Sequence, residues 1–302
     1  MTKSWRTLLG SMLLILPLAA GADDGVPDAV HMEAWFTGSL NSNGASAVPA
    51  GHFLVEPYLG EAIVVPEGGR ASHALQSANL LLYGLTDEVT LGIIPRFSWR
   101  DQAGIGDLTA RLQYRFTAYD AASGMPALAL VLNETLPTGK YDGLNRAGTD
   151  GTGSGAYQTQ LGFLSDEYVT IAGRPLRLRL DLSYRLSAPV ELEDRSVYGT
   201  PDGFRGRVHP GAAYDATLAF EYSLTTRWAV ALDASYDRGD ATRIDGTGFH
   251  APSPIGQSTD LVPALEYNFT ADTGLIVGVQ VPVWQRNASR ILMPMVALNC
   301  VF

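Results

Sequence analysis

Alternation of apolar and polar side chains is the strongest signal in this chain. Between residues 176 and 186 every even-numbered position is Leu or Tyr, and the odd-numbered positions hold Arg177, Arg179, Asp181, Ser183 and Arg185. A β-strand sends successive side chains to opposite faces, so this spacing predicts a strand with one apolar and one polar face. The same period recurs in the segments 106–118, 212–224, 227–238, 257–269 and 273–284.

The alternating segments and the turn residues between them predict about twelve strands. We place them near residues 52–60, 74–83, 88–98, 106–118, 126–136, 155–164, 175–186, 212–224, 227–238, 257–269, 273–284 and 290–302. An even number of such strands is typical of an all-β fold, the transmembrane up-and-down antiparallel β-barrel of bacterial outer membranes. A soluble β-sandwich is the alternative, because its strands alternate in the same way.

The lengths of the predicted connections favour the barrel, in which short periplasmic turns alternate with long outer loops. Short connections fall at 85–87, 225–226 and 270–272. Long connections, rich in Gly, Asp, Thr and Pro, fall at 137–154, 187–211 and 239–256. Two connections depart from the rule, since 165–174 is long for a periplasmic turn and 285–289 is short for an outer loop.

The two ends of the chain support the same fold. Lys3 and Arg6 precede an apolar run at 8–18 and a small-residue cleavage site at 20–22, which predicts a signal peptide over residues 1–22. The last predicted strand ends on an aromatic residue, Phe302. In outer-membrane barrels the aromatic residues form girdles at the interfaces, so we expect Phe302 in the periplasmic girdle and the last strand beside the first. We also expect the barrel-assembly machinery to bind this strand.

Residues 23–51 differ from the rest, and residues 52–302 are expected to form the barrel. The stretch 41–50 is rich in Ser, Asn, Gly and Ala, whereas Met32, Trp35 and Phe36 are large and apolar. One interpretation is a periplasmic tail. The other is a plug inside the barrel, because exposing these apolar side chains to water is unfavourable.

Composition narrows the class of protein. Hydrophobic residues make up 46% of the chain and charged residues 17%, yet no run of about 18 apolar residues follows the leader, which argues against a transmembrane helix. The net charge of −10 argues against nucleic acid as a partner. Cys300 is the single cysteine, so no internal disulfide or multi-cysteine metal site can form.

Three short motifs lie in the first half of the chain: Gly-His-Phe-Leu-Val-Glu-Pro-Tyr at 51–58, Gly-Ile-Gly-Asp at 104–107 and Leu-Pro-Thr-Gly-Lys-Tyr at 136–141. Together they resemble a family of outer-membrane channels associated with meta-pathway phenol degradation. Arg111, Tyr114, Arg115 and Phe116 follow the second motif in the pattern of the family. The resemblance implies an outer-membrane barrel for hydrophobic or aromatic compounds, without a cofactor. It assigns no catalytic or ligand residue to this chain.

Charged residues on the polar faces of the strands are the candidate functional residues, because they are expected to face the lumen. The basic set is Arg96, Arg111, Arg115, Arg177, Arg179 and Arg185. The acidic set is Asp215, Glu221, Asp233, Asp237, Asp260 and Glu266. One interpretation is that these groups form ion pairs that hold the inside of a narrow barrel together. The other is a basic wall facing an acidic wall, whose field orients a solute in transit.

Enzymatic activity is the competing class, since some outer-membrane barrels are lipases. Ser72, His73, His209 and His250 fall near predicted outer loops, but no Gly-x-Ser-x-Gly motif accompanies them. The acidic loop at 137–155 lacks the spacing of an EF-hand, so we expect no metal ion and no cofactor. We therefore predict a bacterial outer-membrane channel for passive uptake of small hydrophobic or aromatic compounds, surrounded by lipid. A structural or adhesin-like barrel is the first alternative and a lipase the second.

Overall fold

The computed structural model describes residues 34–66, 71–146, 148–247, 249–250 and 253–302. The predicted signal peptide at 1–22, and with it residues 23–33 of the predicted periplasmic segment, lie outside the described residues. In the described part of the chain all regular secondary structure is β-strand. No helix in that part is long and apolar enough to cross a membrane.

Twelve antiparallel strands form the barrel, and two of them are interrupted. They are β1 (Phe53–Val65), β2 (Ser72–Gly84), β3 with β4 (Val89–Ile94 and Arg96–Trp99), β5 with β6 (Ala103–Ile105 and Leu108–Thr117), β7 (Ala127–Leu136), β8 (Gln158–Ile171), β9 (Arg174–Ser187), β12 (Ala213–Ser223), β13 (Trp228–Gly239), β16 (Gly256–Asn268), β17 (Thr273–Arg286) and β18 (Arg290–Val301). The prediction of an all-β barrel of about twelve strands is confirmed.

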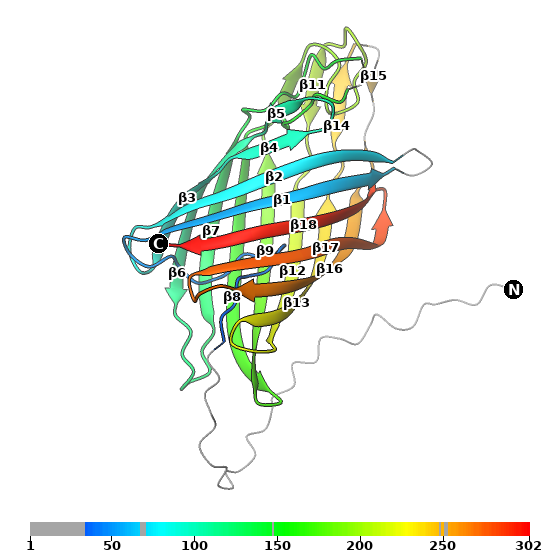
Figure 1. Ribbon diagram of the computed structural model, residues 1–302. Helices are drawn as coiled ribbons and strands as arrows, with labels where there is room; N and C mark the ends of the chain where they lie inside the picture. Colours follow the sequence, from blue (N-terminus) through cyan, green and yellow to red (C-terminus); the bar gives the residue numbers. More distant parts are fainter. Residues whose placement is uncertain (1–33, 67–70, 147, 248, 251–252) are drawn as a thin grey trace, which may run out of the picture. The chain divides into compact units, whose positions relative to one another are not determined.

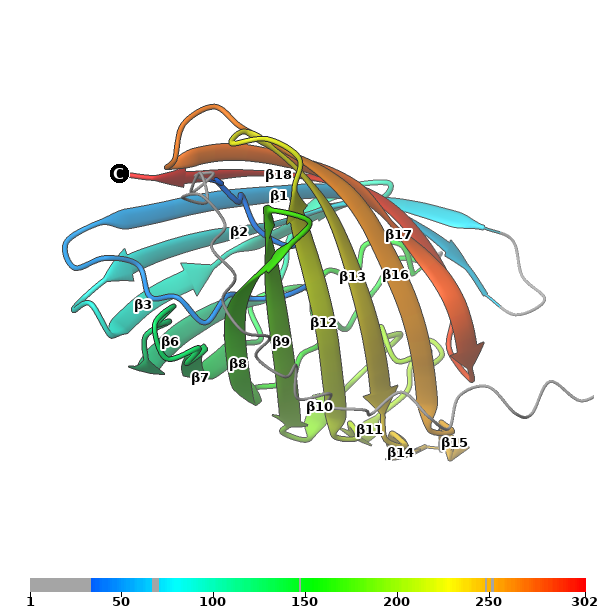
Figure 2. The same ribbon diagram turned by 90° about the horizontal axis from the view of Figure 1, so that it is seen from below.

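The sheet closes because β1 pairs with both β2 and β18 (Figure 1). Phe53 and Phe302 exchange backbone hydrogen bonds, with the amide of each donating to the carbonyl of the other at 2.8 and 3.0 Å. Their rings stack with centroids 6.1 Å apart. Seen from below, the strands surround the dark-blue segment that precedes β1 (Figure 2). The first and last strands therefore form the closing seam that the sequence predicts.

The distribution of side chains is the reverse of that in a soluble protein. Along β12, Leu218 is 42% exposed, whereas Glu221 on the opposite face is completely buried. Along β13, Leu232 is 42% exposed and Asp233 is 1% exposed. In water an exposed apolar face this large is unfavourable, so the outside of this barrel is suited to lipid.

Exposed aromatic side chains gather near both ends of the strands, as the interfacial girdles of outer-membrane barrels do. At the end with the short turns they are Phe53, Tyr114, Phe116, Trp228, Phe269 and Phe302. At the opposite end they include Phe97, Trp99, Tyr157, Tyr214 and Trp284. The two girdles mark the two membrane interfaces, and the end with the short turns corresponds to the periplasmic side of such barrels.

Several strands are longer than the sequence pattern indicates. The expected connection at 165–174 is wrong, because β8 continues to Ile171 and β9 begins at Arg174. Only Ala172 and Gly173 form the turn, both with positive φ (51° and 75°), as a two-residue hairpin turn requires. The apparent exception to the alternation of loop lengths at this position therefore disappears.

Four short strands form a separate sheet in the outer loops, at the end of the barrel that carries β4 and β5 (Figure 1). They are β10 (Val190–Leu192), β11 (Gly206–His209), β14 (Arg243–Gly246) and β15 (Phe249–His250). Phe204, Leu192 and Val208 are almost completely buried in one cluster against this sheet. The long loops are thus a packed structure with a small core of their own.

The two faces of the barrel wall should respond differently to a charge. We predict that Leu232→Arg, on the lipid-facing side, destabilises the barrel by about 2–4 kcal/mol because the guanidinium enters the hydrocarbon region. Gln160→Arg, on the inward face of β8, should cost much less. Urea unfolding in lipid vesicles measures both, and equal costs would contradict the assignment of the faces.

The closing seam should depend on its terminal aromatic residue. We predict that deletion of Phe302 lowers the yield of heat-modifiable, protease-resistant barrel in outer membranes, because the hydrogen bonds and ring contact with Phe53 are lost. Phe302→Tyr retains both contacts and serves as the matched control. Unchanged assembly after the deletion would show that the last strand does not need its terminal residue.

Candidate functional site

The N-terminal segment, residues 34–51, enters the barrel and bonds to acidic side chains of the wall. The hydroxyl of Ser39 donates to Asp233 at 2.6 Å, and the amide of Asn41 donates to the same carboxylate at 2.9 Å. The amide of Thr37 donates to Glu266 at 2.8 Å. Two of the predicted lumen-facing acids therefore bind the backbone and hydroxyls of this segment rather than a basic side chain.

The same segment also bonds to the wall at its tip. Asn43 donates to Asp181 from both its backbone and its side-chain amide, at 3.1 and 2.7 Å. Arg111 donates to the side-chain carbonyl of Asn43 at 2.8 Å, and Gln113 donates to the backbone carbonyls of Gly44 and Ser46. Polar groups buried without a hydrogen bond are costly, so wall and segment satisfy one another.

A compact ion-pair cluster lies on β9 and β12. Glu221 accepts hydrogen bonds from Nε and Nη2 of Arg177, the first at 3.0 Å, and lies 2.9 Å from Nε of Arg179. Both arginines are about nine-tenths buried and Glu221 is completely buried. The partners come from adjacent strands, so these charges pair along the wall rather than across the lumen.

Aromatic residues of the N-terminal segment cover this cluster. The Phe36 ring lies 5.1 Å from the guanidinium carbon of Arg177 and 6.2 Å from the ring of Tyr168. The Trp35 ring lies 5.9 Å from the guanidinium carbon of Arg227, near the turn between β12 and β13. A cation over an aromatic face is favourable, and more so when both are shielded from water. Met32, the third residue of the predicted apolar group, lies outside the described residues.

The remaining candidate residues are spread along the barrel. Arg115 donates to the backbone carbonyl of Asp87 at a periplasmic turn. Asp215 accepts a hydrogen bond from Ser183 at 3.1 Å, and Asp260 is buried on β16. Arg96 and Arg185 line a cavity in the outer half of the barrel. The predicted basic and acidic sets are therefore divided among several local environments.

Sequence reasoning missed two buried carboxylates. Glu56 is 7% exposed on β1, and Asp166 is 1% exposed on β8. Asp166 was missed because it lies in the stretch that the pattern places in a connection. The alternation of β8 carries the signal, since Asp166 shares the inward face with Leu164 once the strand is continued. Glu56 follows the period of its strand, and it lies in the Gly-His-Phe-Leu-Val-Glu-Pro-Tyr motif, whose only interpretation from sequence is the family resemblance.

The cavity in the outer half has a volume of about 650 Å³. One part of its wall is apolar, formed by Leu40 of the N-terminal segment, Tyr58 of β1, and Met293 and Met295 of β18. The other part carries hydroxyl, amide and guanidinium groups. These are Arg96, Arg100, Gln102, Thr109, Asn133, Thr135, Gln158, Gln160 and Arg185. The arrangement suits a molecule with one apolar and one polar end.

Two of the sequence motifs meet at the rim of this cavity. Asp107, at the end of the Gly-Ile-Gly-Asp motif, accepts hydrogen bonds from the amides of Gly139 and Ser154 at 3.0 and 2.7 Å. Thr138 of the Leu-Pro-Thr-Gly-Lys-Tyr motif accepts a hydrogen bond from the amide of Leu108 and donates one to the carbonyl of Gly106. These bonds fix the loop between β7 and β8 to the wall, which gives both motifs a structural role.

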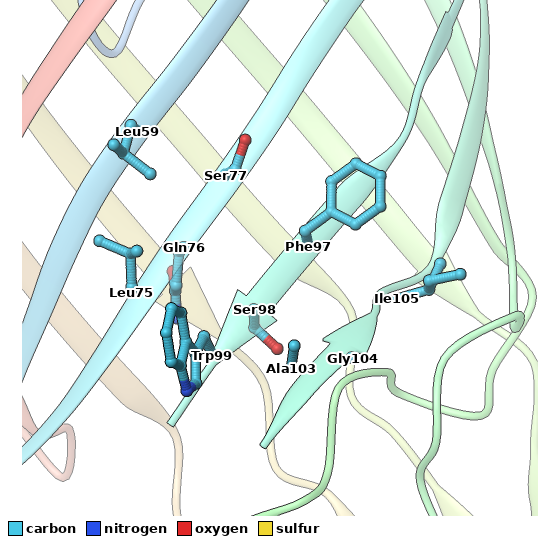
Figure 3. A pocket seen from close by; sticks show the side chains of 10 residues that line it. All are labelled: Leu59, Leu75, Gln76, Ser77, Phe97, Ser98, Trp99, Ala103, Gly104 and Ile105. Carbon is cyan, nitrogen blue, oxygen red and sulfur yellow. The ribbon is translucent and has the colours of Figure 1, made fainter. Parts of the chain in front are cut away.

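An apolar groove of about 320 Å³ lies on the outside of the same wall (Figure 3). Leu59 of β1, Leu75 of β2, Phe97 and Trp99 of β4, and Ile105 of β5 line it, and each is more than a third exposed. β5 pairs with β4 along one edge only. Along the other edge, Thr152 of the β7–β8 loop donates its hydroxyl to the carbonyl of Ile105 at 2.7 Å. Thr152 also lines the inner cavity, so it lies between the cavity and the groove.

The groups required for a hydrolase or a metal site are not assembled in the described residues. His73 bonds to Glu61 at 2.9 Å, and in the described part of the chain it has no hydrogen bond to a serine. No cluster of three or more His, Cys, Asp or Glu side chains among the described residues could hold a metal ion. In the acidic loop, Asp150 pairs with Lys140 and accepts from the amide of Asn145.

These features define an outer-membrane β-barrel of twelve strands. The chain belongs to the family described as "Putative MetA-pathway of phenol degradation", whose model matches residues 38–291. The match includes all three motifs named above, and it extends well beyond them into the second half of the chain.

Two solved structures share the fold. One is the COG4313 outer membrane channel from Pseudomonas putida F1, at a TM-score of 0.63 and 18% identity, covering 87% of this chain and 100% of that chain. The other is the NanC porin, at a TM-score of 0.50 and 11% identity, covering 82% of this chain and 98% of that chain. A comparison with curated proteins found no match.

The ion-pair cluster should contribute to stability. We predict that Glu221→Gln destabilises the barrel by about 3–5 kcal/mol, because it leaves two buried guanidinium groups without their counterion. Urea unfolding in lipid vesicles measures the loss. Glu191→Gln is the matched control, since it removes an exposed ion pair with Arg207 in the outer sheet and should cost about 1 kcal/mol or less. Equal losses would contradict a structural role for the cluster.

Proposed function

We propose that this barrel is a channel for passive uptake of small, partly apolar compounds, aromatic ones in particular, and that it catalyses no reaction. The observation that carries the proposal is the cavity in the outer half, with its apolar wall at Leu40, Tyr58, Met293 and Met295 and its polar wall opposite. A concave site of this size that combines apolar surface with convergent polar groups is typical of small-molecule binding. Diffusion down a concentration gradient needs no cofactor.

The N-terminal segment is proposed to act as a plug on the periplasmic side of this cavity. Leu40 forms part of the cavity lining, and residues 37–43 bond to Glu266, Asp233 and Asp181 below it. A solute that moves straight down the barrel would have to displace these hydrogen bonds. The arrangement therefore favours a path that leaves the cavity before it reaches the segment.

We propose that such a path passes beside β5. The cavity and the lipid-facing groove share Leu59, Phe97 and the stretch 76–77 in their linings, so they are separated by a single layer of the wall. At the free edge of β5 the layer is completed by Thr152, a loop residue, instead of a neighbouring strand. An apolar solute could enter the membrane there once this loop moves.

Two further proposals concern the export and assembly of the chain. Residues 1–22 are removed on export as a signal peptide, and residues 52–302 assemble as the barrel. The barrel-assembly machinery acts on β18, whose terminal Phe302 completes the closing seam with Phe53. A structural or adhesin-like role is the alternative function, and it would leave the cavity without a use.

Transport is tested by two measurements on the assembled protein. Uptake of labelled phenol is measured in a Gram-negative host that lacks its major porins, and single-channel conductance is measured in planar bilayers. We expect saturable uptake above the empty-vector level and a small conductance, because the N-terminal segment fills the periplasmic half. Uptake at the empty-vector level would refute the proposed function.

A disulfide between β5 and the β7–β8 loop tests the path. A Cβ built on Gly104 would lie 3.5 Å from the Cβ of Thr152, within the range that disulfides need. We predict that the variant Gly104→Cys with Thr152→Cys, made with Cys300→Ser, loses most of its uptake when oxidised and regains it on reduction. The single variant Thr152→Cys in the same background is the control.

The outcomes separate the path from the function. Uptake that is the same in the oxidised and reduced double variant would rule out the path beside β5. The solute would then have to follow an axial path past the N-terminal segment. Loss of uptake in both redox states, with normal heat-modifiability, would show that the substitutions themselves disturb the cavity rim. The single variant identifies that effect, because it cannot form the bond.

A further inference from the structure

The basic side chains in the cavity are unusual for a site that takes only neutral hydrocarbons. Arg96 of β4, Arg100 of the turn that follows it and Arg185 of β9 all line the cavity. None of the ion pairs among the described residues includes any of these three arginines. They contrast with Arg177 and Arg179, which share Glu221.

Only one acidic side chain, Asp107, is among the described residues that line the cavity. Its two carboxylate oxygens accept hydrogen bonds from the amides of Gly139 and Ser154 and from the Ser154 hydroxyl. Those bonds fix the loop between β7 and β8, so this carboxylate has a structural role. With three guanidinium groups and a single carboxylate in its lining, the cavity has an excess of positive charge.

This excess stands out because the chain as a whole is acidic, with a net charge of −10. The lumen-facing acids Asp215, Asp237 and Asp260 of β12, β13 and β16 do not line the cavity. Asp215 lies on the strand next to that of Arg185 and accepts a hydrogen bond from the hydroxyl of Ser183. A solute in the cavity therefore meets the guanidinium groups first.

The polar wall already holds one of the arginines in position. Arg96 donates to the hydroxyl of Thr109 at 2.6 Å, and Thr109 in turn bonds to Thr135 at 2.8 Å. A guanidinium has five donors in a planar fork, so Arg96 retains donors for a ligand. Carboxylates are the groups that such a fork binds most favourably, through charge-assisted hydrogen bonds.

The apolar wall lies on the opposite side of the barrel from Arg185. Met293 and Met295 are on β18, five strands away from β9 around the sheet, and Tyr58 is on β1, six strands away. Methionine sulfur makes favourable contacts with aromatic rings, and its flexible side chain adapts to rings of different shape. A ring against the methionines thus leaves its substituent directed toward the basic groups.

We propose that the cavity is a binding site for small aromatic monocarboxylates, with the carboxylate at Arg96, Arg100 and Arg185 and the ring against Met293 and Met295. The proposal rests on the proposed function, because it names the class of solute that the channel takes. It adds a preference for the anion that a purely hydrophobic path would not have. The overall negative charge of the chain by itself would predict the opposite preference.

Three probes of nearly the same shape test the charge preference: benzoate, benzamide and benzylamine. Their dissociation constants are measured by titration calorimetry on the full barrel in detergent at neutral pH. We expect benzoate to bind about tenfold or more tightly than benzamide, since a charge-assisted hydrogen bond contributes more than a neutral one. Benzylamine should bind most weakly. Equal affinity for the three probes, or tightest binding of benzylamine, would overturn the proposal.

Variants test the residues. Arg100→Gln combined with Arg185→Gln should weaken benzoate binding about tenfold and benzamide binding by a much smaller factor, because the variant removes charge without altering the apolar wall. Arg100→Lys with Arg185→Lys should retain most of the affinity for benzoate. Arg286→Gln combined with Arg290→Gln is the matched control, as it removes two exposed positive charges that do not line the cavity. An equal loss with this control would assign the effect to overall charge and overturn the site.

Uptake of the same probes distinguishes this proposal from the proposed function. If benzamide and phenol are taken up but benzoate is neither bound nor taken up, the carboxylate site is overturned and the proposed channel function stands. Benzoate binding that depends on Arg100 and Arg185, without uptake of any probe, would support the site and refute transport. Heat-modifiability of each variant confirms that the barrel has assembled.

Discussion

The absence of water in the hydrocarbon core is the constraint on which this structure depends. Every backbone amide and carbonyl at that depth needs a partner within the protein, so a sheet in the membrane must close on itself. Here β1 meets this requirement by pairing with β2 along one edge and with β18 along the other. Closure also fixes the faces, since lipid takes the apolar side chains and leaves the polar ones inside.

Because the sheet is closed, the polar side chains of its inner face are buried in the lumen. Glu221, Glu266 and Asp233 are almost completely buried there, and a buried charge is stable only when it is paired and hydrogen-bonded. Arg177 and Arg179 supply partners for Glu221, and the N-terminal segment supplies partners for the other two. Wall and segment therefore depend on each other, and the periplasmic half of the lumen is filled as a result.

The sequence was sufficient for the barrel because alternation is a local property, readable along β9, β12 and β13 without knowledge of their neighbours. It was not sufficient for the lumen, because pairing there depends on which strands are adjacent. Glu221 belongs with Arg177 and Arg179 only because β9 and β12 are paired across a long outer loop. The bonds of Asp233 and Glu266 to residues 37–41 link positions about 190–230 apart in the chain, and no period in the sequence predicts them.

The same constraint explains why the outer half differs from the rest of the barrel. β7 ends at Leu136, before Pro137, so the wall beside β5 continues as a loop where elsewhere it continues as a strand. In that loop the Thr152 hydroxyl bonds to the Ile105 carbonyl, and Asp107 holds the chain at Gly139 and Ser154. A single side-chain hydrogen bond contributes only about 1 kcal/mol net, whereas a strand pair is held by a whole ladder of such bonds. The wall beside β5 is therefore held less firmly than a paired strand, and it adjoins the residues of β1, β2 and β4 that line both the inner cavity and the lipid-facing groove.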